Sequence, residues 1–220
     1  MSEVVEESRK ADALTYASDN VGHLARMEIA GGGQIVIKGR LAFVGHQHGP
    51  EGTTILDISD PRRPRVLTQL MTSHPWSHSH KVRVVGDLMV VNSEIEPGKG
   101  DRSSYPDGGF RIYDIANPAT PKLITFVKTH ARGVHRFDLD ESYAYISTEM
   151  AGFVGNILII YDIRNPSKPR EVARWWMPGQ PAGGGAAAPP RGRAPARKRL
   201  LHSAAYAGKE DALDQRRRQG

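Results

Sequence analysis

The chain has 220 residues, contains no cysteine and carries a formal net charge of +6 at pH 7. Without cysteine it can form no disulfide, thiolate-bound zinc site, iron–sulfur cluster or cysteine nucleophile. A metal ion would have to be bound by histidine nitrogen and carboxylate oxygen.

The excess positive charge lies entirely in the C-terminal tail. Residues 1–179 contain 21 Lys or Arg and 21 Asp or Glu, whereas residues 180–220 contain 9 and 3. The rest of the chain gives no sign of a phosphate-binding groove, so we expect no nucleic-acid partner. No apolar stretch reaches the length of a membrane-spanning helix, so we also expect no membrane association.

Residues 1–21 are polar and acidic and are expected to form a flexible N-terminal segment. They lack the basic start and apolar centre of a signal peptide, which predicts a cytoplasmic location provided that Met1 is the true start. Residues 22–29, GHLARMEI, resemble a lone outer strand that has no preceding strands of its own.

A motif of the form D-I-x-[DN]-P-x-x-P occurs three times, each time at the end of an apolar strand. The copies are TTILDISDPRRP at 53–64, GFRIYDIANPATP at 109–121 and ILIIYDIRNPSKP at 157–169. Proline cannot extend a strand ladder, and Asp or Asn caps a bend with its side chain, so each motif predicts a turn. Asp57, Asp114 and Asp162 are therefore interpreted as structural turn residues.

Each copy belongs to a longer unit of about four strands in about fifty residues, which is the size of a β-propeller blade. The units span 33–72, 80–128 and 135–178. Central runs such as LMVV and ILII are apolar at every position, as expected of strands covered on both faces. We predict an all-β fold, a β-propeller with about three complete blades and an incomplete ring, in which 22–29 closes a further blade.

Beyond Pro178 the composition changes to Gly, Ala, Pro and Arg, and residues 179–220 are interpreted as a low-complexity basic tail. A remnant of a further blade is recognisable at 198–208, where His202 takes the place of His80 and His135. Codons rich in G and C, read out of frame, yield mainly these residue types. The hypothesis is that the C-terminus is truncated or frame-shifted.

The triple motif resembles LVIVD-repeat proteins over residues 22–178, with a trace at 198–208. This resemblance implies a β-propeller, in a family of which many members have no assigned activity. More distantly, the arrangement is similar to propellers of the selenium-binding and methanethiol-oxidase type, which implies metal-binding histidines near the central channel. Their motifs cannot be matched residue by residue, so no catalytic residue follows from that resemblance.

Two histidine–glutamate pairs have the same spacing. His80 and Glu94 are 14 residues apart, as are His135 and Glu149, and a tight turn lies midway in each case. Residues equidistant from the turn of a hairpin face each other with Cβ atoms about 5 Å apart. Each histidine is therefore predicted to lie opposite its glutamate, on first strands that line the central channel.

The histidines carry three open interpretations. They are transition-metal ligands, most directly His80, His135 and His202, with carboxylates that orient the imidazoles. Alternatively, each pair is a structural hydrogen bond repeated from blade to blade, or the pairs serve acid–base chemistry or substrate binding.

Further candidates come from two loops. His46 and His48 follow the second strand of the first blade, and alternate residues of an extended segment point to one face, so both are expected at the same rim. The loop 95–109 adds Tyr105 and Arg102 as candidate binding residues. The predicted rim set is His46, His48, His78, His80, Glu94, His135 and Glu149.

Two functions are compatible with these patterns. The chain lacks nucleophile-elbow, zincin, P-loop and dinucleotide-binding motifs. The first hypothesis is a binding or scaffold module that holds an unknown protein or small-molecule ligand at the channel rim. The alternative is a metal-dependent enzyme, such as an oxidoreductase, that uses the channel histidines.

Overall fold

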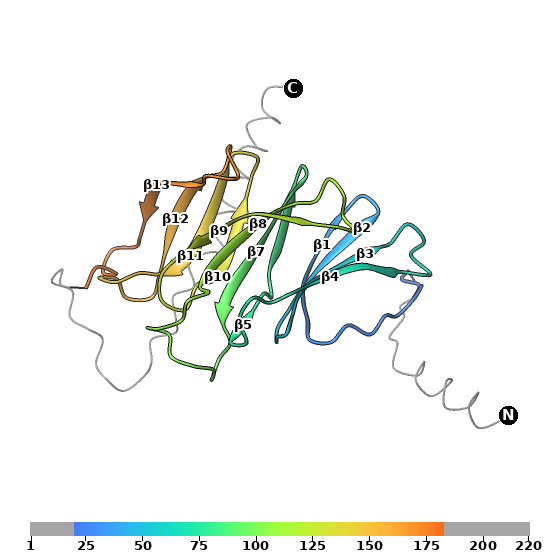
Figure 1. The fold of residues 1–220 in the computed structure, drawn as a ribbon, viewed down its shortest axis with the longest axis horizontal. Helices are drawn as coiled ribbons and strands as arrows, with labels where there is room; N and C mark the ends of the chain where they lie inside the picture. Colours follow the sequence, from blue (N-terminus) through green and yellow to red (C-terminus); the bar gives the residue numbers. More distant parts are fainter. Residues whose placement is uncertain (1–19, 183–220) are drawn as a thin grey trace.

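The computed structural model describes residues 20–182, which form thirteen strands and no helix (Figure 1). The strands make three separate antiparallel sheets. Residues 20–182 therefore contain no helix that could cross a membrane. The predicted all-β fold is confirmed.

Each sheet is a simple up-and-down meander. The first has the order β1 (Gly32–Lys38), β2 (Leu41–His46), β3 (Glu51–Asp57) and β4 (Arg65–Met71). The third has the order β10 (Val134–Leu139), β11 (Tyr143–Glu149), β12 (Asn156–Asp162) and β13 (Arg170–Trp175).

The second sheet differs at its inner edge. Its order is β5 (Ser77–His78), β7 (Leu88–Ile95), β8 (Gly109–Asp114) and β9 (Lys122–Lys128), and β6 (Val82–Val85) also pairs with β7. The expected first strand of this blade is thus divided into two pieces, β5 and β6, and the residues between them carry part of the candidate site.

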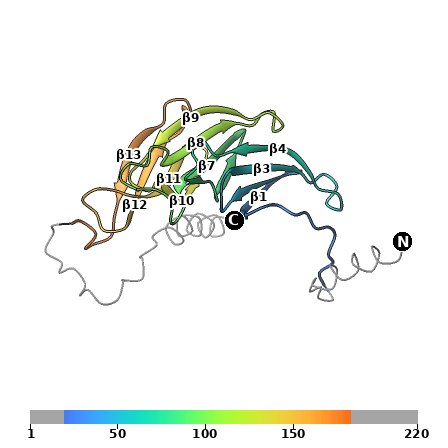
Figure 2. The ribbon, with the colours of Figure 1, turned by 60° about the horizontal axis from the view of Figure 1, so that its bottom comes forward.

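The three sheets stack face to face, and Figure 2 shows them following one another in an arc. Phe43 and Ile55 of the first sheet pack against Met89 of the second. On the opposite face of the second sheet, Val90 and Phe110 join the core that includes the third sheet. The continuous apolar run of β7 is explained because its side chains alternate between two cores. This stacking is that of neighbouring β-propeller blades.

The repeated motif forms the same turn after the third strand of each sheet. The carboxylates of Asp57, Asp114 and Asp162 each accept a hydrogen bond from the backbone N–H two residues on, at 2.8, 2.8 and 3.1 Å. The following proline then ends the strand pairing. This geometry accounts for the recurrence of the motif without a chemical role.

Residues 22–29 form no strand within the described part of the chain. Met27 and Ile29 pack instead against Ala42, Val44 and Leu56 on the outer face of the first sheet. The role of this segment in closing a further blade stays a prediction. Residues 1–19 and 183–220, which include His202, the remnant at 198–208 and most of the predicted tail, lie outside the described residues.

Candidate functional site

The segment that carries His78 and His80 is held against the first sheet by its backbone. The N–H of His46 donates to the carbonyl of Ser79 at 2.9 Å, and that of Gln34 donates to the carbonyl of His80 at 3.1 Å. Gly45 permits this approach, because a Cβ atom there would lie 2.6 Å from the carbonyl carbon of His80.

The other side of the site comes from the junction of the second and third sheets. Glu94, near the end of β7, lies opposite His78 in the strand register and forms an isolated bridge with Gly133. The N–H of Ile95 donates to the carbonyl of Arg132 at 2.9 Å. These contacts place Arg132 and His135 beside the carboxylate of Glu94.

Four charged or titratable side chains converge on that carboxylate and form a cluster with it. They are those of His78, His80, Arg132 and His135. Oε2 of Glu94 lies 2.9 Å from Nδ1 of His135, 3.2 Å from Nε2 of His78 and 4.0 Å from Nδ1 of His80. Oε1 lies 2.5 Å from Nε of Arg132. The side chain of Glu94 is 0% exposed and that of His135 is 24% exposed, so His135 is the member of the cluster that solvent reaches most.

The tautomer of His78 follows from its other contact. Its Nδ1 lies 2.8 Å from the carbonyl oxygen of Gln47, which can only accept a hydrogen bond, so Nδ1 carries the proton. Nε2 faces Oε2 of Glu94 at 3.2 Å, so it donates a hydrogen bond to that carboxylate when the ring carries a second proton and is an acceptor in the neutral ring. A proton or a metal ion between the two atoms would relieve this contact.

His80 is held neutral. Burial, followed by the charges of His78 and Lys81, lowers the pKa of His80 to about 3. Asn92 is oriented by backbone groups at both ends, since its Oδ1 accepts from Lys81 N and its Nδ2 donates to Val134 O. Its amide therefore points a second N–H at Nδ1 of His80, at a long 3.3 Å.

Glu94 is ionised. Burial acts to raise the pKa of this carboxyl group, but hydrogen bonds from His135 and His78 and the charge of Arg132 outweigh it and lower the pKa to about 2. The contact with Arg132 lacks hydrogen-bond alignment despite its short distance, so it acts as an ion pair. Nε2 of His135 is buried without a hydrogen-bond partner.

Two predicted pairings are wrong in register. His78 rather than His80 lies opposite Glu94, because the first strand is interrupted after β5. His135 does not face Glu149, because a bulge between Val134 and Arg136 shifts the register of β10 against β11. His135 turns instead to Glu94 of the neighbouring sheet.

Three further members of the predicted rim set lie outside the cluster. The ring of His46 is buried between Ala30 O at 2.7 Å and Thr54 Oγ1 at 2.8 Å, which makes it a structural residue. Exposed His48 lies 2.9 Å from Glu96. Glu149 lies opposite Asn156 and pairs with Arg102.

Sequence reasoning missed Arg132 and Asn92. Asn92 is the second residue before Glu94 on β7, so strand alternation could have placed it on the same face. Arg132 carries no such signal, because it precedes β10 and reaches Glu94 only through contact between sheets.

A buried polar network lies on the other face of β5 and β7. Oγ of Ser77 lies 2.6 Å from the hydroxyl of Tyr105, and both Ser77 and Ser93 donate to Oδ2 of Asp107, at 2.7 and 2.9 Å. This network anchors the loop 95–109 beneath the cluster. It explains Tyr105 as a structural residue.

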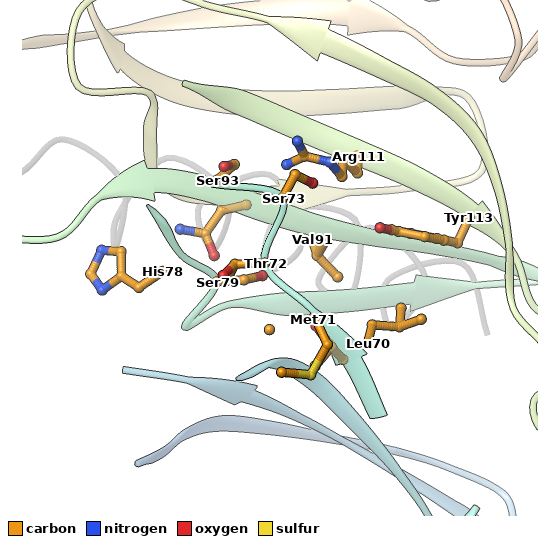
Figure 3. A pocket seen from close by; sticks show the side chains of 13 residues that line it. Leu70, Met71, Thr72, Ser73, His78, Ser79, Val91, Ser93, Arg111 and Tyr113 are labelled. Atoms are coloured by element: carbon orange, nitrogen blue, oxygen red, sulfur yellow. The ribbon is translucent and has the colours of Figure 1, made fainter. Parts of the chain in front are cut away.

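A small cavity of about 20 Å³, lined by both polar and apolar groups, lies between the first and second sheets and is large enough for about one water molecule. Figure 3 shows His78 at one end of its lining and Arg111 and Tyr113 toward the other. The cavity borders the cluster without containing it.

His78, His80 and Glu94 have the composition and spacing of a metal site. One potential ligand atom from each lies within 4.8 Å of the other two. Ligands about 2.1 Å from a tetrahedral ion are about 3.4 Å apart, so small side-chain movements would suffice for coordination. Two histidines and one carboxylate on one side of an ion also leave coordination positions open.

Blade-like sheets stacked in an arc, with a polar cluster where two sheets meet, define a repeat protein of the β-propeller class. The LVIVD repeat model matches residues 32–72, 105–129 and 132–175. The chain belongs to the LVIVD repeat family.

The chain is similar to the crystal structure of the N-terminal domain of Nup159, with 13% identity and a TM-score of 0.43. The match covers 74% of this chain and 36% of that one, so the chain spans about a third of the length of that structure. No curated protein matches the chain.

Proposed function

We propose that the protein is a binding module whose ligand, held where the second and third sheets meet, is a divalent transition-metal ion. The ligands are His78, His80 and Glu94; His135 holds the carboxylate in place by a hydrogen bond, and Arg132 offsets its charge. Imidazole nitrogen with one carboxylate oxygen suits zinc, iron, nickel and copper. When bound, such an ion would supply Lewis-acid chemistry at its open position.

One observation carries this proposal, namely that one potential ligand atom from each of His78, His80 and Glu94 lies within 4.8 Å of the other two. A proton on His78 would satisfy only its own contact with Glu94 and would leave His80 with only the long contact from Asn92. A metal ion would engage both imidazoles. The protonation states also suit coordination, which requires neutral imidazole and ionised carboxylate.

Calorimetric titration of the chelator-washed protein with Zn²⁺, Ni²⁺ and Co²⁺ tests the proposal. We expect one site per chain and an affinity at least about a hundredfold lower in His78→Ala and in Glu94→Gln, since even indirect partners of a metal contribute tenfold to a hundredfold. His48→Ala is the matched control, because exposed His48 contacts a carboxylate outside the cluster. Wild-type protein that binds none of the three ions would contradict the proposal.

The same module could bind a protein through its blade loops, or catalyse a metal-dependent oxidation. Protein binding and oxidation were both compatible with the sequence, but no specific contact in the structure supports either of them. Metal binding is therefore the function that the geometry supports best.

A further inference from the structure

The charges around the candidate metal site do not balance once an ion is bound. Glu94 is the one carboxylate of the described residues within the cluster, and Arg132 is already paired with it at 2.5 Å. The two histidine ligands are neutral when they coordinate. A divalent ion would therefore bring two positive charges that no side chain of the cluster offsets.

Other charged side chains nearby do not neutralise the net positive charge that the bound ion would bring. Lys81 follows His80 directly, and its charge acts on that imidazole. Arg102 and Glu149 pair with each other, as do Arg83 and Asp138 at 3.1 Å, so these carboxylates are already matched.

Burial makes the imbalance costly. The side chains of His78, His80 and Glu94 are 7%, 4% and 0% exposed, so water screens the ion poorly. A buried charge without a partner is strongly unfavourable, and the remedy is a partner of opposite sign. Three protein ligands leave at least one position open for it.

We propose that the ion at this site takes a small anion as its exchangeable ligand, and that Arg132 creates this preference by cancelling the charge of Glu94. This inference rests on the proposed metal site. His135 is the most exposed side chain of the cluster, so an anion would reach the ion on that side, and the burial of His78, His80 and Glu94 restricts it to a few atoms. The ligand class is a small monoanion with an oxygen, nitrogen or sulfur donor atom.

If Arg132 sets the anion preference, its removal should change metal affinity and anion affinity in opposite directions, which loss of a purely structural role would not do. Without the guanidinium, Glu94 would offer its full negative charge to the ion. Removal of Arg132 is therefore expected to strengthen metal binding and to weaken anion binding. A loss of folding or of site geometry would weaken both.

The test uses the full chain loaded with Co²⁺, whose visible absorption reports on its ligands, and sodium azide as the probe. Azide is expected to change the spectrum of the wild-type protein in a saturable manner. Arg132→Gln should weaken azide binding by about tenfold or more, because the full charge of Glu94 then offsets that of the ion, and should raise the affinity for Co²⁺. Arg65→Gln is the matched control, since Arg65 pairs with the single carboxylate of Asp57 in the first sheet.

Arg132→Lys keeps the charge and should retain azide binding near the wild-type value, which covers the case in which Arg132→Gln fails to fold. The results separate the two proposals. Wild-type protein that does not bind Co²⁺ overturns the metal site itself. Protein that binds Co²⁺ but shows no spectral response to azide, or equal azide affinity in wild type and Arg132→Gln, overturns the anion preference alone.

Discussion

Oε2 of Glu94 accepts a hydrogen bond from Nδ1 of His135 at 2.9 Å, and the two residues belong to different sheets. Glu94 lies near the end of β7 and His135 on β10, so the contact fastens the second blade to the third. Both Glu94 and its partner Arg132 are buried, which makes the carboxylate a structural element as well as a candidate ligand.

Replacement of Glu94 should therefore be costly even without metal. Glu94→Gln leaves Arg132 buried without its counter-charge, and loss of one partner of a buried pair costs about 3–5 kcal/mol. The free energy of unfolding from urea titration measures this. Glu149→Gln is the control, because its ion pair with Arg102 is long and more exposed and should contribute less than about 1 kcal/mol. Equal losses in the two variants would count against a stabilising role for the buried pair.

The metal-free protein should lose stability as the pH falls below neutrality. The pKa of His80 is about 3 when folded and 6.5 as the ordinary value, so the unfolded chain binds the extra proton between these values. The contribution of neutral His80 to the free energy of unfolding is therefore complete above pH 6.5 and decreases as the pH falls toward 3. Between pH 7 and pH 5 the expected loss is about 2 kcal/mol.

Urea midpoints at several pH values measure this slope, and His80→Gln should flatten it while His48→Gln should not. Glu94 adds to the loss only at lower pH, because its pKa falls from 4.5 to about 2 on folding. If the stability of the protein changes equally between pH 7 and pH 5 with and without His80, the pH dependence does not come from the lowered pKa of His80.

Gly45 should not tolerate a side chain. A Cβ atom at this position would lie 2.6 Å from the backbone of His80, so β2 and the histidine segment would have to separate. Gly45→Ala should cost about 1–3 kcal/mol, as for other overpacked sites, and should weaken metal binding. Thermal unfolding and metal titration together check this, with Gly22→Ala, where a Cβ atom meets nothing within 4 Å, as the control. Metal affinity equal to that of the wild type would show that the spacing is not critical.

The hydroxyl of Tyr105 should contribute to stability through the network beneath the cluster. It lies 2.6 Å from Ser77 Oγ and 3.3 Å from Ser93 Oγ. Tyr105→Phe should lower the free energy of unfolding by about 1 kcal/mol, the usual contribution of a buried hydrogen bond. Tyr143→Phe is the matched control, because the ring of Tyr143 lies beneath the guanidinium of Arg164, away from the network of Ser77, Ser93 and Asp107. An unchanged stability in Tyr105→Phe would mean that the serines find other partners at no cost.

Some features of the candidate site were predictable because they depend on short stretches of chain. The clustering of His78, His80 and His135 at one place followed from equivalent positions in stacked blades. The expectation that imidazoles pair with a carboxylate followed from the equal spacing of each His–Glu pair about a hairpin turn. The partners themselves were predicted incorrectly, since His80 and His135 were each assigned the glutamate of their own hairpin.

The amino-acid sequence alone determined the repeated sheet, because strand periodicity and the Asp-Ile-x-Asn/Asp-Pro turn act within a few residues of one another. Only the tertiary structure decided which imidazole meets which carboxylate. One bulge at His135 and one interruption after His78 alter the register, and Arg132 reaches Glu94 across two sheets. Such contacts depend on how sheets pack against each other, which no local pattern records.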